Sequence, residues 1–132
     1  MSEISVKALA YLGDCVIELC VRRFLVSCGI SHSAGLNSAA LDFVRAGAQA
    51  EAVKRILPIL TEEEAAAFRR GRNIGHTNTP KSASVGQYRA ATGMEVLFGW
   101  LDTRGENDRV NELFLAAYKE LIDEYKRKAG II

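Results

Sequence analysis

Apolar residues that recur every three or four positions, in a chain with only two prolines, constrain the fold more than any other feature of this sequence. That spacing places side chains on one face of an α-helix. No segment shows the alternation of apolar and polar residues, bounded by turn residues, that would predict a strand. With 132 residues, of which 48% are hydrophobic, the chain is large enough for one packed domain over residues 1–132. The sequence therefore predicts an all-α helical bundle.

Five helices are expected, over residues 5–28, 37–57, 62–71, 84–101 and 109–128. Gly29 stops the first helix, and Pro58 ends the second because the residue before a proline disfavours helical geometry. Capping boxes begin at Thr61 and Ser84 and start the third and fourth helices. Asp108 is expected to cap the last helix. Residues 72–83 contain glycine, asparagine, threonine and proline, which indicates a loop.

Two of the expected helices each carry a carboxylate inside an apolar run, Asp14 in the first and Glu95 in the fourth. A buried carboxylate is costly unless it is paired or binds a metal. Gly13, Gly93 and Gly99 lie beside these acids, and small residues let two helix backbones approach closely. We expect Asp14 and Glu95 to share one pocket that holds a hard cation such as Mg²⁺. The alternative is that both are structural partners of buried arginines.

Glu18 lies one helical turn after Asp14 and on the same face of the helix. It is a candidate for a further metal ligand, or for a group that supports the ligands. An ion pair with Arg22, four residues further on, is the alternative.

Charge is distributed unevenly in a chain whose net charge is only +1. Residues 65–94 contain no Asp or Glu, but they contain five cations: Arg69, Arg70, Arg72, Lys81 and Arg89. Such a stretch is a candidate face for binding nucleic acid, and a solvated loop with incidental arginines is the alternative. The loop within it has no aromatic residue, so double-stranded RNA fits better than stacked single strands.

Three cysteines lie in the first expected helix, at spacings that match no zinc site. We expect them to be reduced, as in a cytoplasmic protein. No segment resembles a secretion signal or reaches the length of a membrane span.

These residues, taken together, resemble the catalytic domain of the ribonuclease III family. Residues 11–16, Tyr-Leu-Gly-Asp-Cys-Val, resemble its signature helix, and residues 95–101, Glu-Val-Leu-Phe-Gly-Trp-Leu, resemble its second acidic motif. The segments 70–73, 79–81 and 88–95 stand in the expected order between them. The resemblance covers nearly the whole chain and is strongest to the small bacterial branch, Mini-ribonuclease III, which lacks a double-stranded RNA-binding domain.

The resemblance implies a homodimeric, Mg²⁺-dependent endonuclease domain that cuts double-stranded RNA, and for this branch the maturation of precursor 23S ribosomal RNA. Asp14 and Glu95 match the metal-binding catalytic carboxylates. The residues implied to face RNA are Arg70, Arg72, Asn73, Lys81 and Arg89. Because no separate RNA-binding domain is expected, a ribosomal protein that shapes the precursor is a further partner hypothesis.

The larger members of the family carry additional acids where this chain has Lys7, Ala10 and Thr92. This difference leaves two rival hypotheses open. The first is a catalytically inactive RNA-binding or ribosome-associated module with the same fold, although Asp14 and Glu95 are intact. The second is a helical protein-interaction domain, which the acid-free basic stretch argues against.

Overall fold

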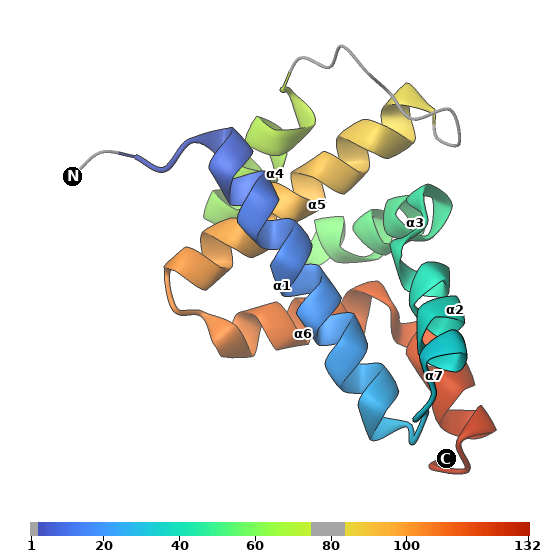
Figure 1. Cartoon of the computed structure of the whole chain (residues 1–132). Coiled ribbons are helices and arrows are strands. Elements are labelled where there is room, and N and C mark those ends of the chain that lie inside the picture. The colour runs from blue at the N-terminus through green and yellow to red at the C-terminus, as the bar shows by residue number, and fades with distance from the viewer. Residues whose placement is uncertain (1–2, 75–83) are drawn as a thin grey trace.

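A computed structural model describes residues 3–74 and 84–132 and shows an all-α architecture in these ranges, as predicted. Figure 1 shows the arrangement, in which the long first helix crosses the fifth. The elements are α1 (Val6–Ser27), α2 (Ser33–Val44), α3 (Ala46–Ile56), the 3₁₀ turn η1 (Leu57–Ile59), α4 (Glu62–Arg72), α5 (Val85–Thr103), α6 (Asn107–Ala117) and α7 (Lys119–Lys128). No described helix combines the length and apolar character needed to cross a membrane.

The predicted helix ends are confirmed where local capping chemistry sets them. The Ser5 hydroxyl accepts a hydrogen bond from the Ala8 backbone N–H, and Gly29 has a positive φ of 85° after the end of α1. Both capping boxes form, with Thr61 and Ser84 as the capping residues of α4 and α5. These short-range hydrogen bonds satisfy backbone groups that have no partner inside the helix.

Two predicted helices are each divided in the structure. The one expected over 37–57 consists of α2 and α3, because Arg45 between them is extended, with a ψ of 151°. The one expected over 109–128 consists of α6 and α7, separated at Tyr118, whose buried ring lies 5.3 Å from that of Phe43. The cap predicted at Asp108 is wrong, since α6 begins at Asn107, two residues before the predicted start, and Glu106 occupies the capping position.

Helix α5 is the centre of the bundle. It packs most extensively on α1 and α4 and also contacts α3 and α6. Eight of its residues are buried, including Met94, Leu97, Phe98 and Leu101. Because this helix is covered on several sides, any polar side chain on it must be positioned by its neighbours.

Candidate active site

Helices α1 and α5 meet through glycines, where their backbones touch. A Cβ added to Gly13 would lie 1.6 Å from the backbone oxygen of Glu95, and one added to Gly99 would lie 2.1 Å from the backbone oxygen of Leu9. No larger residue fits at either position without moving a helix. The close contact places Asp14, which follows Gly13, beside Glu95.

The structure brings Asp14 and Glu95 together at this crossing, as the sequence predicts. Glu95 is partly buried, and Asp14 is exposed. Burial, reinforced by the negative charge of Asp14 and a hydrogen bond with it, raises the pKa of Glu95 to about 8. Neither carboxylate forms an ion pair with any residue in the described ranges, so the buried-arginine alternative is not found there.

Glu18 is directed to a different partner. Its carboxylate accepts a hydrogen bond from Arg22 at 3.3 Å, which is the ion pair considered as the alternative. Within residues 3–74 and 84–132, no group of three or more His, Cys, Asp or Glu side chains is placed to hold a metal ion. The described site therefore offers two carboxylates per chain.

Thr92 lies one turn before Glu95 on α5. The larger enzymes of the family that this sequence resembles carry an acid at this position. Its hydroxyl donates a hydrogen bond to the Tyr88 backbone oxygen at 3.0 Å. The side chain is thus turned onto its own helix and adds no anionic ligand.

The basic residues expected to face RNA lie at the end of α4 and in the first half of α5. Arg70, Arg72 and Arg89 are exposed, and none forms an ion pair with a described residue. Asn73 ends α4, and its side-chain oxygen accepts a hydrogen bond from Arg72 Nε at 3.4 Å. Lys81 lies outside the described residues.

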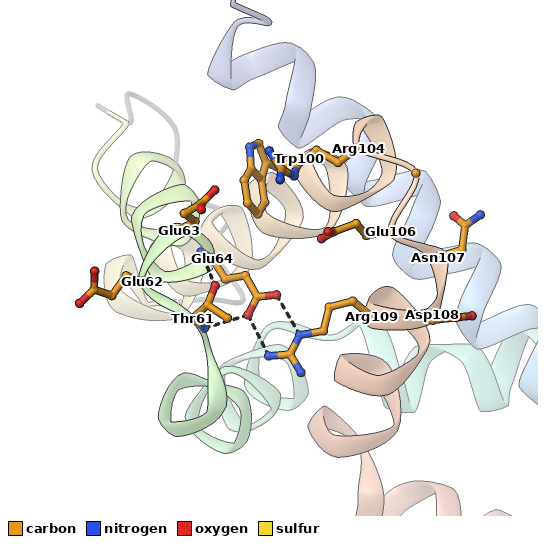
Figure 2. A pocket seen from close by; sticks show the side chains of 11 residues that line it. Thr61, Glu62, Glu63, Glu64, Trp100, Arg104, Glu106, Asn107, Asp108 and Arg109 are labelled. Carbon is orange, nitrogen blue, oxygen red and sulfur yellow. Dashed lines mark hydrogen bonds and ion pairs between the residues drawn. The ribbon is translucent and has the colours of Figure 1, made fainter.

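A hollow of about 810 Å³ lies between the start of α4 and the turn joining α5 to α6, and neither Asp14 nor Glu95 lines it. Figure 2 shows the Arg109 guanidinium meeting the Glu64 carboxylate, with Trp100 and Arg104 across the hollow. Two hydrogen bonds of 2.8 Å join Arg109 to the two Glu64 oxygens. These bonds hold the pKa of Glu64 below its usual range.

The sequence does not indicate this ion pair, because Glu64 is conspicuous there only as part of a capping box. Its 45-residue separation from Arg109 leaves no local signal. The pair holds α6 onto α4, and Arg109 also donates to the Ile59 backbone oxygen at 2.8 Å. We assign it to the stability of the fold.

The helical bundle and the adjacent carboxyl groups of Asp14 and Glu95 define the class: an α-helical domain with an acidic centre suited to a divalent cation. The family model of the ribonuclease III domain matches residues 7–105. Mini-ribonuclease 3 of Symbiobacterium thermophilum is 42% identical over 109 residues, which cover 83% of this chain and 84% of that protein. Mini-ribonuclease 3 of Enterococcus faecalis is 41% identical over 108 residues, covering 80% and 82%.

A solved structure supports the same fold. The crystal structure of a Fusobacterium nucleatum protein matches with a TM-score of 0.79 and 27% identity, over 89% of this chain and 94% of that one. The chain therefore belongs to the ribonuclease III family, in the group of the Mini-ribonuclease 3 proteins. It is an endoribonuclease of the ribonuclease III type, a family that acts on double-stranded RNA.

Proposed function

We propose that this protein is a Mg²⁺-dependent endonuclease for double-stranded RNA, with residues 1–132 as one catalytic domain, and that it matures the ends of precursor 23S ribosomal RNA. The observation that carries the proposal is the pair of adjacent acids, Asp14 and Glu95, where α1 crosses α5, neither of which forms an ion pair with a cation among the described residues. Helical packing alone gives no reason to place two acids side by side. A bound cation would give both acids a partner.

The donor set fits a hard divalent cation. Both side chains offer carboxylate oxygens, which Mg²⁺ prefers together with water and phosphate oxygens. Burial, followed by the negative charge of Asp14, raises the pKa of Glu95, and a bound cation would offset both effects. When bound, Mg²⁺ stabilises negative charge on the scissile phosphate and lowers the pKa of a water. Asp14 and Glu95 would hold and orient the ion.

Arg70, Arg72, Asn73, Lys81 and Arg89 are proposed to bind the RNA backbone. Exposed guanidinium groups suit phosphates, and an amide suits sugar hydroxyls. Since the net charge is only +1, we expect modest affinity for bare duplex that falls steeply as salt rises.

We also propose a homodimer formed through the outer face of α1. Apolar side chains on this face recur at spacings of four and seven and are all exposed: Tyr11, Cys15, Leu19 and Val26. Tyr11 is 86% exposed, far more than a core aromatic would be, so core packing does not explain it. Trp100 on α5 is a second aromatic candidate for the dimer interface, and the Arg104 guanidinium lies 4.7 Å from the centre of its ring. Two sites across the dimer are proposed to cut opposite strands.

The protein is proposed to act in the cytoplasm. Its choice of one precursor RNA is proposed to depend on a ribosomal protein that shapes that RNA. Cleavage of precursor RNA should then be faster when that RNA is assembled with ribosomal protein than when it is bare. Equal rates would refute the need for a partner.

The decisive experiment compares cleavage of a labelled RNA duplex, with and without Mg²⁺, by the wild type, Asp14→Asn and Glu18→Gln. We expect cleavage only with Mg²⁺, loss in Asp14→Asn, and retention in Glu18→Gln, which removes a carboxylate of the same helix one turn away. Cleavage by neither the wild type nor Asp14→Asn, with duplex binding intact, would favour the inactive RNA-binding module. Equal cleavage by the wild type and Asp14→Asn would refute the site.

A further inference from the structure

Helices α4 and α5 meet through one glycine from each side. A Cβ added to Gly71 of α4 would lie 2.8 Å from the Thr92 backbone oxygen and 2.7 Å from Val96 Cγ2. A Cβ added to Gly93 of α5 would lie 2.6 Å from the Phe68 ring of α4. The two contacts allow the helices to lie closer than side chains would permit, and Figure 1 shows them side by side.

Gly71 occupies a position that links the two halves of the proposed site. On α4 its immediate neighbours are Arg70 and Arg72, which are exposed cations. On α5 it contacts residues 92 and 96, which lie on either side of Glu95 in the sequence. One contact therefore fixes how far the arginines lie from the carboxylate.

We propose that Gly71 is a positioning residue for RNA cleavage, which sets the distance between the phosphate-binding arginines of α4 and the carboxylates of the metal site. This inference rests on the proposed function, since it assumes those roles for Arg70, Arg72 and Glu95. Gly71 touches neither substrate nor metal and acts through the placement of α4.

The α5 side of this contact cannot yield to a methyl group. The Thr92 oxygen is part of the helix backbone, and Val96 is fully buried. Alanine at position 71 must therefore push the last turn of α4 outward by several tenths of an ångström. Misplacement of reacting groups by ~1 Å can cost ~100-fold in rate. Duplex binding is less sensitive, because phosphates repeat along the whole backbone.

The test compares the wild type with Gly71→Ala and with the matched control Gly86→Ala, an exposed α5 position where a Cβ has its nearest neighbour at 3.9 Å. Four quantities are measured: the single-turnover cleavage rate at saturating duplex RNA, duplex affinity in EDTA, Mn²⁺ affinity without RNA, and the melting temperature. For Gly71→Ala we expect the cleavage rate to fall at least ~10-fold while both affinities stay within about threefold. Gly86→Ala should match the wild type throughout.

A second pair of variants probes the same interface if Gly71→Ala does not fold. Gly93→Ala should lower the cleavage rate in the same selective way, and Phe68→Leu added to it should restore the rate by making room for the methyl group. A Gly71→Ala rate within twofold of the wild type, or the absence of rescue in the second pair, would overturn the positioning role alone. A parallel loss of Mn²⁺ affinity would also overturn it, because Gly71 would then support the carboxylates themselves. A wild type that neither cuts nor binds Mn²⁺ would remove the proposed function and this inference together.

Discussion

Replacement of Glu95 by glutamine tests the electrostatic argument for the site most directly. Glutamine keeps the shape of the side chain, and its amide can donate to Asp14 as the protonated carboxyl does. It removes only the charge. The variant should lose metal binding and cleavage, yet fold more stably than the wild type at alkaline pH without metal.

The magnitude follows from the raised pKa of Glu95. A pKa raised from 4.5 to about 8 corresponds to roughly 5 kcal/mol against ionisation, at about 1.4 kcal/mol per pKa unit. The folded protein keeps this proton between pH 4.5 and about 8, where the unfolded chain has released it. The free energy of unfolding therefore falls as pH rises through this window and levels off above it. Because Glu95 is only partly buried, we expect a measured loss of about 2 to 4 kcal/mol.

The assay is urea unfolding at fixed protein concentration in EDTA, at pH 5, 7 and 9. The difference in unfolding free energy between Glu95→Gln and the wild type should grow across the series. Glu18→Gln, whose parent carboxylate is paired with Arg22, should follow the wild-type profile. Mg²⁺ at pH 9 should stabilise the wild type and leave Glu95→Gln unchanged. Parallel profiles for Glu95→Gln and the wild type would refute the reasoning, since Glu95 would then titrate normally.

Three further predictions concern other parts of the molecule. Arg109→Met should lower the free energy of unfolding, measured in urea, by about 2 to 4 kcal/mol, because it leaves the Glu64 side chain, only 5% exposed, without its cation. Adding Glu64→Leu to this variant should recover part of the lost stability. Tyr11→Ser should shift the sedimentation coefficient from dimer to monomer with little change in helical circular dichroism; a dimer of unchanged affinity would exclude this face. Arg70→Ala should reduce the slope of log affinity for duplex RNA against log salt by about 1, and an unchanged slope would show that Arg70 contacts no phosphate.

The fold was predictable wherever short-range chemistry decides it. The capping boxes at Thr61 and Ser84 and the stop at Gly29 depend on residues within a few positions of each other, so they could be predicted from the sequence. The break at Arg45 could not, because apolar residues continue on both sides of it and packing decides where the helix turns. The same holds at Tyr118, which is buried among aromatic rings from α2 and α6.

The candidate site was predictable for a different reason. Asp14 and Glu95 are conspicuous in the sequence because acids and glycines rarely share an apolar helix, and their resemblance to known motifs placed them together. The ion pair of Glu64 with Arg109 had no such signal, since each residue alone suits an exposed helix start. The sequence could not decide whether Glu18 supports the metal site or pairs with Arg22. The structure shows the pair with Arg22.

The contact of α1 with α5 at Gly13 and Gly99 has a consequence for how this protein can change. Since backbone atoms meet there, the spacing of the two carboxylates does not depend on the volume of any side chain between the helices. Hydrophobic residues elsewhere in the bundle can be exchanged for others of similar volume without changing the spacing of the two carboxylates. Tolerance in the core and intolerance at the contact glycines are therefore linked, and a library that randomises the core while holding Gly13, Gly71, Gly93 and Gly99 should retain many active members.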